Sequence, residues 1–299
     1  MKRLQNSLVI VFLFLISLSA CVNPSIQKTT QLTSPLPVKT ATETPEPVST
    51  STEKSPTQFI PSPTPDCRFI PGVVKQDSFD SLILEKKFTF SIYLPPCYDE
   101  SSAIGFPVLY MLHGLGATDE QWIRIGLVEK MDKLIASGNI PPFMVVLPQE
   151  PNFYIPDKSD FDEVLIQELI PYVDGHYASK AERDFRAIGG LSRGAAWAIR
   201  LGVDHWALFS AIGAHSLPVF ENDKLHILRQ LNSISPEDWP DIFIDIGLSD
   251  PDLASAKSFE EALNDAVIPH TWYLFSGSHD ETYWQNHLES YLLWYALQW

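Results

Sequence analysis

Hydrophobic runs of strand length alternate with segments of helix length between residues 67 and 299. The runs expected to form strands are Phe88–Leu94, Pro107–Leu112, Phe143–Leu147, Phe185–Ile188, Leu208–Ile212, Ile242–Ile246 and Thr271–Phe275. PVLYML and FMVVL are apolar throughout, as is typical of parallel strands buried on both faces. Helices are expected at Glu120–Ala136, Asp160–Asp174, Gly194–Val203, Asp252–Ala266 and Glu281–Leu297. This alternation predicts one α/β domain, with a mostly parallel central sheet and helices on both of its faces.

The first twenty residues have the pattern of an export signal. Lys2 and Arg3 precede an apolar run from Leu8 to Ile16, which is too short to cross a membrane comfortably. The run ends in Leu-Ser-Ala-Cys, which resembles a bacterial lipobox. We therefore predict a signal peptide at residues 1–20 and lipidation of Cys21, which would place the protein outside the cytoplasm, anchored to the cell membrane. An uncleaved anchor or a buried apolar helix is the alternative.

Residues 21–66 have a different composition and are predicted to be a disordered linker. Between positions 22 and 66, 25 of 45 residues are Pro, Ser or Thr, and glycine is absent. Such a segment buries too little apolar surface to offset the entropy lost on ordering, and its prolines favour extended conformations. We expect it to act as a tether.

The remaining domain is acidic and contains two of the three cysteines. From residue 67 onward there are 16 Lys and Arg and 33 Asp and Glu, a formal charge of 16 − 33 = −17. This charge argues against a nucleic-acid partner, which requires a basic face. With Cys21 lipidated, Cys67 and Cys97 remain in an exported domain, where oxidation to a disulfide is expected. Two free buried thiols are the alternative. The oligomeric state stays open.

A tight turn of small residues follows the run that ends at Ile188. Gly190-Leu191-Ser192-Arg193-Gly194 matches the G-x-S-x-G pattern, in which a serine sits on a sharp turn between a strand and a helix. The N–H groups at the start of that helix would face a negative charge that develops beside the serine. A glycine-rich turn with a solvent-facing serine is the alternative.

Two later residues can complete a catalytic group with Ser192. A serine hydroxyl needs a base, and the base needs an acid that orients it. In chain order, Asp250 and His279 each follow a predicted strand, so all three would lie at the carboxyl edge of one sheet. Asp252 is the alternative acid, although its position before a helix also fits an N-cap.

The loop after PVLYML supplies further candidates. Its sequence His-Gly-Leu-Gly allows the N–H of Leu115 to face the serine, and the N–H of Arg193 would be the second oxyanion donor. His113 is expected to be mainly structural, but together with Trp122 and Tyr283 it forms the candidate set for the substrate pocket. Trp122 could instead pack as a core aromatic residue.

From Cys67 to its C-terminus the chain resembles the "putative esterase" branch of the α/β-hydrolases. This branch includes esterase D, feruloyl, acetylxylan and enterochelin esterases and the mycolyltransferases. The matching segments are YLPPCYD, PVLYMLHGLG, LIQELIPYVDGHY, GGLSRGAAWA, DIGLSDPDL and GSHDETYW. The resemblance implies Ser192 as nucleophile, His279 as base and Asp250 as acid, with oxyanion donors at Leu115 and Arg193. No long insertion suggests a lid, so we expect an open pocket.

These patterns predict a secreted, lipid-anchored serine carboxylesterase. It would act through an acyl-enzyme on acyl esters of carbohydrates or small alcohols and need no cofactor. The rivals are an acyltransferase that uses a sugar hydroxyl as acceptor, a peptidase, and a binding lipoprotein that has lost its chemistry. A metal-dependent hydrolase is disfavoured, because His279, Asp280 and His287 do not have the spacing of a zinc motif.

Overall fold

The computed structural model describes residue 67 and residues 70–102, 104–154 and 156–299. The predicted signal peptide at residues 1–20, the lipidation site at Cys21 and the linker at residues 21–66 lie outside the described residues. Within the described part of the chain, no helix combines the length and apolar character needed to cross a bilayer.

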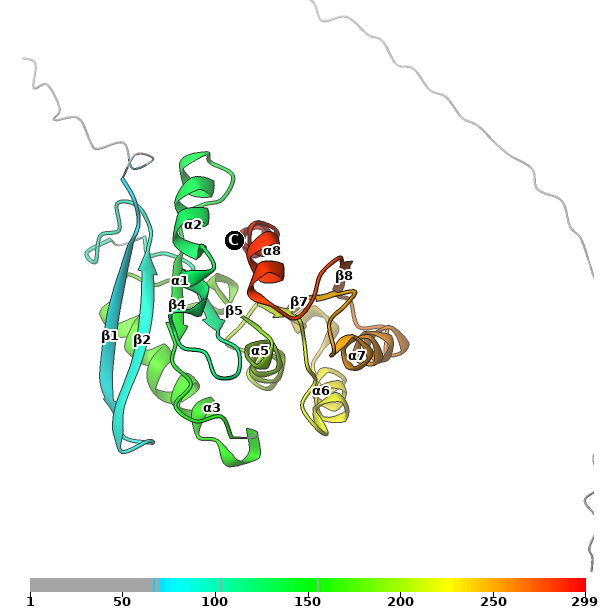
Figure 1. Cartoon of the computed structure of the whole chain (residues 1–299). Helices are drawn as coiled ribbons and strands as arrows, with labels where there is room; N and C mark the ends of the chain where they lie inside the picture. Colours follow the sequence, from blue (N-terminus) through cyan, green and yellow to red (C-terminus); the bar gives the residue numbers. More distant parts are fainter. Residues whose placement is uncertain (1–66, 68–69, 103, 155) are drawn as a thin grey trace, which may run out of the picture. The chain divides into compact units, whose positions relative to one another are not determined.

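An eight-stranded sheet forms the centre of the domain (Figure 1). Its strands are β1 (Val73–Ser81), β2 (Lys86–Leu94), β3 (Val108–Leu112), β4 (Met144–Pro148), β5 (Arg186–Leu191), β6 (Ala211–His215), β7 (Asp241–Gly247) and β8 (Thr271–Phe275). They lie in the order β1-β2-β4-β3-β5-β6-β7-β8. The pairs β1–β2 and β2–β4 are antiparallel and all other pairs are parallel, so the carboxyl ends of β3 to β8 share one edge.

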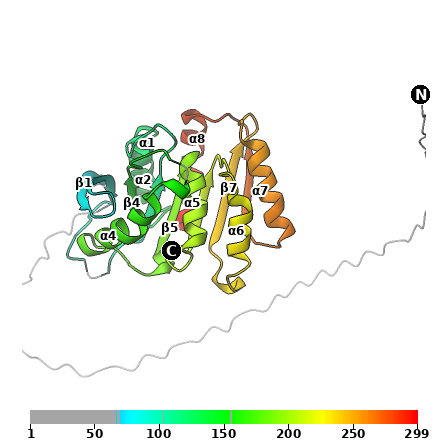
Figure 2. The same cartoon turned by 90° about the horizontal axis from the view of Figure 1, so that it is seen from below.

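Helices cover both faces of this sheet, as expected (Figures 1 and 2). On one face lie α1 (Gln121–Arg124), α2 (Leu127–Ala136) and α8 (Glu281–Ala296). On the other lie α3 (Phe161–Val164), α4 (Ile170–His176), α5 (Arg193–Asp204), α6 (Asp223–Leu231) and α7 (Leu253–Asp265). Leu165–Leu169 joins α3 to α4 as a π-helical segment. Short 3₁₀ turns occur at Pro156–Lys158, Arg183–Phe185 and Pro236–Asp238.

The structure differs from the sequence prediction at two strands. Strand β1, which the hydrophobic pattern did not indicate, is an edge strand of largely polar residues, most of them exposed or half-buried, and it pairs with β2 along its whole length. The strand expected at Leu208–Ile212 instead runs over Ala211–His215. Its Gly213 packs beneath the hydroxyl of Tyr295, where a Cβ atom would overlap. Because β6 contains small residues that allow close packing, the hydrophobic pattern did not reveal where this strand begins and ends.

Two helical regions also differ. The helix expected at Glu120–Ala136 is divided into α1 and α2 at Gly126, which has a φ of 97° and cannot continue an α-helix. Helix α6 was not expected, because its apolar stripe is short; only Ile227 and Leu231 place apolar side chains fully in the core. Neither difference alters the carboxyl edge of the sheet.

A disulfide joins Cys67 to Cys97, as the sequence predicts, with 5.5 Å between their Cα atoms. Cys97 follows β2, which runs antiparallel to β4. The bridge therefore lies at the edge of the sheet opposite the carboxyl ends of the parallel strands. It ties the beginning of the described domain to its second strand.

Candidate active site

Ser192 occupies a strained turn between β5 and α5. Its backbone angles are φ 53° and ψ −125°, and its N–H donates to the carbonyl of His215 at 2.8 Å. Such angles cost energy in a residue with a side chain and tend to occur where function requires them. A Cβ atom at Gly190 would overlap the backbone of Gly194, and one at Gly194 would overlap the carbonyl of Leu112. Both glycines of the motif are therefore sterically required.

The structure brings together the three residues predicted to act with one another. The hydroxyl oxygen of Ser192 lies 2.7 Å from Nε2 of His279. Nδ1 of the same histidine lies 2.9 Å from Oδ2 of Asp250. Ser192 follows the carboxyl end of β5, Asp250 follows that of β7, and His279 follows that of β8. This is the arrangement in which a histidine can remove the serine proton while a carboxylate fixes its tautomer.

The surroundings of the histidine and the acid favour a charged pair. The hydrogen bond to Asp250 raises the pKa of His279 above that of an ordinary imidazole, and burial offsets only part of this rise. Burial alone would raise the pKa of Asp250, but hydrogen bonds from His279 and from the N–H of Asp252 outweigh it and lower that pKa. Asp250 therefore stays ionised and stabilises a protonated His279.

Ser216 and Trp284 surround this pair and were not identified from the sequence. Ser216 is fully buried and lies just past β6 with a φ of 52°. Its hydroxyl accepts a hydrogen bond from Nε1 of Trp284 at 3.0 Å, and the Trp284 ring packs edge-on to the ring of His279, with 5.2 Å between centroids. The position of Ser216 at a strand end on the carboxyl edge was the available signal.

Two backbone N–H groups in the segments that meet at Ser192 are candidates for oxyanion donors. A Cβ atom at Gly114 would come within 3.5 Å of the Ser192 Cβ, so the loop after β3 passes close to the serine. The Gly114 N–H is occupied by Oε1 of Gln121 at 2.8 Å. The N–H groups of Leu115 and Arg193 have no acceptor among the described residues. Leu115 and Arg193 therefore stay the predicted pair of oxyanion donors.

Glu150 is a further site residue that sequence reasoning missed. Its carboxylate binds the Arg193 guanidinium at both oxygens, with Nε–Oε2 at 2.8 Å and Nη2–Oε1 at 2.5 Å, and it also accepts from Nε1 of Trp197 at 3.1 Å. Glu150 is 4% exposed, and a buried ion pair of this kind is stable only with full hydrogen bonding. It fixes the first residue of α5, whose N–H is an oxyanion candidate. Its place directly after β4 was the available signal.

The three residues predicted to line the substrate pocket are instead part of the core. Nδ1 of His113 donates to the Gly114 carbonyl at 2.8 Å, Nε2 accepts the Glu150 N–H at 3.0 Å, and burial lowers the pKa of His113. The Trp122 indole donates to the Leu112 carbonyl at 3.0 Å, and the Tyr283 hydroxyl donates to Oδ2 of Asp245 at 2.6 Å. All three are at most 3% exposed. His113 is structural, as expected. Trp122 packs in the core, which is one of the two alternatives that the sequence left open, and the pocket assignment of Tyr283 is corrected.

Exposed apolar side chains lie on the loops that carry the site. Leu115 belongs to the loop beside Ser192, and Leu248 precedes Asp250. Phe153 packs edge-on to His113, and the neighbouring Tyr154 accepts a hydrogen bond from Arg193 through its carbonyl. These four side chains are between 45% and 65% exposed. The loops around Ser192 therefore carry exposed apolar and aromatic surface.

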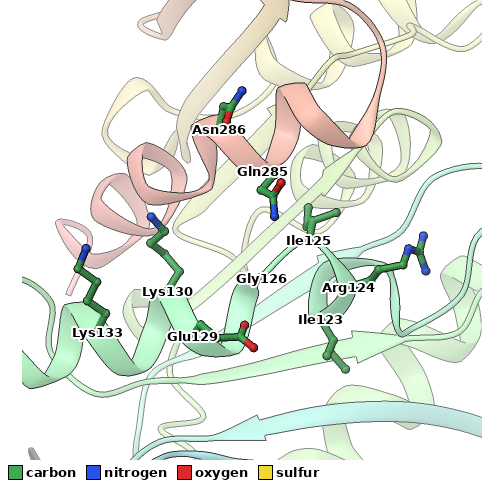
Figure 3. Close-up of a pocket in the computed structure, with 9 residues that line it drawn as sticks. All are labelled: Ile123, Arg124, Ile125, Gly126, Glu129, Lys130, Lys133, Gln285 and Asn286. Carbon is green, nitrogen blue, oxygen red and sulfur yellow. The ribbon is translucent and has the colours of Figure 1, made fainter.

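A groove of about 610 Å³ between α1–α2 and α8 is separate from this site (Figure 3). No residue of the Ser192 group lines it. An ion pair between Arg124 and Glu281 and another between Lys130 and Glu289, the latter at 2.9 Å, join the helices beside the groove. Its charged groups therefore largely neutralise one another.

Asp250, Asp252 and His279 form the one group in the described chain whose side chains could hold a metal ion. One ligand atom from each lies within 4.8 Å of the others. A metal at Nδ1 of His279 would displace the proton that this nitrogen shares with Asp250. Both ring nitrogens of His279 already lie within hydrogen-bond distance of a protein partner, Asp250 at Nδ1 and Ser192 at Nε2.

Comparison with known proteins identifies related esterases. An endo-1,4-beta-xylanase/feruloyl esterase from Xylanibacter ruminicola is 38% identical over 136 residues, which cover 41% of this chain and 18% of the relative. Esterase Rv1288 from Mycobacterium tuberculosis is 27% identical over 136 residues, covering 43% and 28%. The chain thus matches less than a third of the length of these curated relatives.

Solved structures show the same fold. A ferulic acid esterase superposes with a TM-score of 0.69 at 24% identity, covering 77% of this chain and 100% of its own. A feruloyl esterase module from Clostridium thermocellum, complexed with sinapinate, gives 0.66 at 19%, covering 78% and 92%. The fluorophosphonate-binding serine hydrolase F of Staphylococcus aureus gives 0.64 at 18%, covering 76% and 99%.

The model of the Esterase family, described as "Putative esterase", matches residues 81–295. This range extends from the last residue of β1 into the last turn of α8 and contains Ser192, Asp250 and His279. The chain therefore belongs to this esterase family and has the α/β-hydrolase fold.

Proposed function

We propose that this protein is a serine carboxylesterase with Ser192 as nucleophile, His279 as general base and acid, and Asp250 as the orienting acid. The observation that carries the proposal is the continuous line of hydrogen-bond distances, 2.7 Å from Ser192 to His279 and 2.9 Å from His279 to Asp250. The membership of this chain in the esterase family supports the same reaction class.

In this reaction, His279 takes the proton of Ser192 as its hydroxyl oxygen attacks the ester carbonyl carbon. The carbonyl oxygen becomes an oxyanion that accepts hydrogen bonds from the N–H groups of Leu115 and Arg193. His279 then gives its proton to the leaving alkoxide, so an alcohol departs and an acyl-serine remains. Water repeats the sequence, releasing the carboxylic acid and restoring Ser192.

The proposed substrates are acyl esters of carbohydrates or small alcohols, with aromatic acyl groups such as feruloyl as the first to test. Exposed Phe153 and Tyr154 beside the site supply flat apolar surface for such a group. A curated relative and two solved structures bear feruloyl or ferulic acid in their names.

The proposal is tested by assaying the purified domain on feruloyl, acetyl and p-nitrophenyl esters, with a sugar acceptor present and absent. Ser192→Ala and His279→Ala should each lower kcat by several orders of magnitude while the fold remains, and the double variant should be scarcely worse, because the residues act as one unit. Full activity in Ser192→Ala would refute the proposal. Acylated sugar in place of free acid would identify an acyltransferase.

We also propose that the mature protein is exported and anchored through lipidated Cys21, with residues 22–66 as the tether. A diacylated cysteine with an acylated amine supplies enough chains for stable anchoring. Cys21→Ala should release the protein from the membrane fraction or block its processing. Unchanged membrane retention of that variant would contradict the proposal.

A further inference from the structure

Asp252 lies at the N-cap of α7 but does not cap the helix. Its side chain accepts no hydrogen bond from the first turn of α7. At the start of α8, in contrast, Asp280 accepts the N–H of Tyr283 at 2.9 Å, as an N-cap should. Oδ2 of Asp252 lies instead 3.9 Å from Nδ1 of His279. Helix capping therefore does not explain where this carboxylate points.

The same histidine nitrogen thus faces two carboxylates with different surroundings. The Asp250 side chain is fully buried and lies 2.9 Å from Nδ1, whereas the Asp252 side chain is 37% exposed. The two are coupled, because the N–H of Asp252 donates to Oδ1 of Asp250 at 2.9 Å. The segment after β7 therefore places two carboxylates near Nδ1 of His279, one at 2.9 Å and the other at 3.9 Å.

We propose that Asp252 is a second positioning acid for His279. Its charge stabilises the imidazolium that forms when Ser192 attacks, and its carboxylate can accept the hydrogen bond from the Nδ1–H when Asp250 is removed. This inference rests on the proposed function. The charged groups that act on His279 are Asp250 and Asp252, from the segment after β7, and Asp280, from its own loop. The Asp280 carboxylate is held by the N–H of Tyr283 at the α8 cap. Asp252 is therefore the second carboxylate that can interact with Nδ1 of His279.

A pH profile distinguishes this role from a structural one. Asp252→Asn keeps the size of the side chain but removes its charge, so the imidazolium of His279 loses stabilisation. The midpoint of the acid limb of kcat/KM should move to lower pH by on the order of half a unit, the shift expected of a partly solvated charge at about 4 Å. Asp265→Asn, at the other end of α7, makes the same charge change on an exposed residue and should leave the midpoint unchanged. An unmoved midpoint in Asp252→Asn overturns the proposal.

A double-mutant cycle tests whether Asp252 can act on His279 in place of Asp250. Asp252→Asn should lower kcat by a few fold in the wild-type protein. In the Asp250→Ala background it should lower kcat by about tenfold or more, because the histidine then loses its remaining charged acceptor. Equal factors in the two backgrounds would contradict the proposal.

Ser192→Ala in the same assay distinguishes a failure of the proposed function from a failure of the proposed role of Asp252. If Ser192→Ala retains activity, the proposed function itself fails. If Ser192→Ala is inactive and Asp252→Asn has equal factors in both backgrounds, only the role of Asp252 fails. Thermal unfolding of each variant confirms that the compared proteins are folded.

Discussion

In the proposed mechanism, the protonation state of His279 sets the pH range of activity. His279 must be neutral to accept the Ser192 proton, and its hydrogen bond to Asp250 raises its pKa. Activity should therefore rise with pH through a midpoint above the ordinary histidine value of about 6.5. The measurement is kcat/KM against pH with a substrate whose own ionisation is constant.

Asp250→Ala provides the matched control for this profile. Removing Asp250 takes away the largest influence that raises the pKa of His279, so the acid limb should move to lower pH while kcat falls. An acid limb at or below the ordinary histidine value in the unmodified protein would show that the Asp250–His279 bond does not persist in solution.

At the residue scale, position along the chain predicted that Ser192, Asp250 and His279 lie together, but it did not predict the residues that support them. Ser192, Asp250 and His279 each follow a strand, and parallel strands bring such positions to one edge. Glu150, Ser216 and the core contacts of Tyr283 depend on side-chain directions across different elements, which spacing does not reveal. For the same reason, the sequence could not decide between pocket and core for Trp122, and it placed the buried Tyr283 in the pocket.

At the scale of elements, the Cys67–Cys97 bridge should stabilise the domain without serving its chemistry. It closes a loop with a sequence separation of 30 residues. In the chain-entropy model such a loop contributes roughly 3–4 kcal/mol to the free energy of unfolding. Because the bridge lies at the edge of the sheet opposite Ser192, the kcat of the folded protein should be unchanged.

The experiment compares the wild-type domain with Cys67→Ser/Cys97→Ser in chemical denaturation and in ester hydrolysis. A lower midpoint with the same kcat is expected. An equal loss of kcat under conditions where the variant is fully folded would show that β1 and β2 influence the site.

The elements best predicted from the sequence are those with a strong pattern. Continuous apolar runs located β3 and β4 correctly, because these strands are buried on both faces. Strand β1 lies at the edge of the sheet and needs few apolar residues. Neither an alternation of apolar and polar residues nor a hydrophobic run therefore marked it as a strand in the sequence. The break at Gly126 depends on a left-handed backbone angle that a glycine permits but does not require.

At the scale of the whole molecule, the domain carries a formal charge of −17 from residue 67 onward. This charge should disfavour strongly anionic substrates through long-range repulsion, and the effect should weaken as salt screens it. Neutral acyl esters are consistent with this field. The composition indicated this much, but the acyl group depends on the shape of the exposed loops around the site.

Catalysis by the proposed mechanism passes through an acyl group on Ser192. The direct test is to mix the domain with an activated aryl ester, quench it with acid during turnover, and map the modified peptides by mass spectrometry. One added acyl group is expected on the peptide that contains Ser192, formed with a burst of released phenol and absent from Ser192→Ala. Turnover with no covalent adduct, or an acyl group on a different residue that persists in Ser192→Ala, would contradict it.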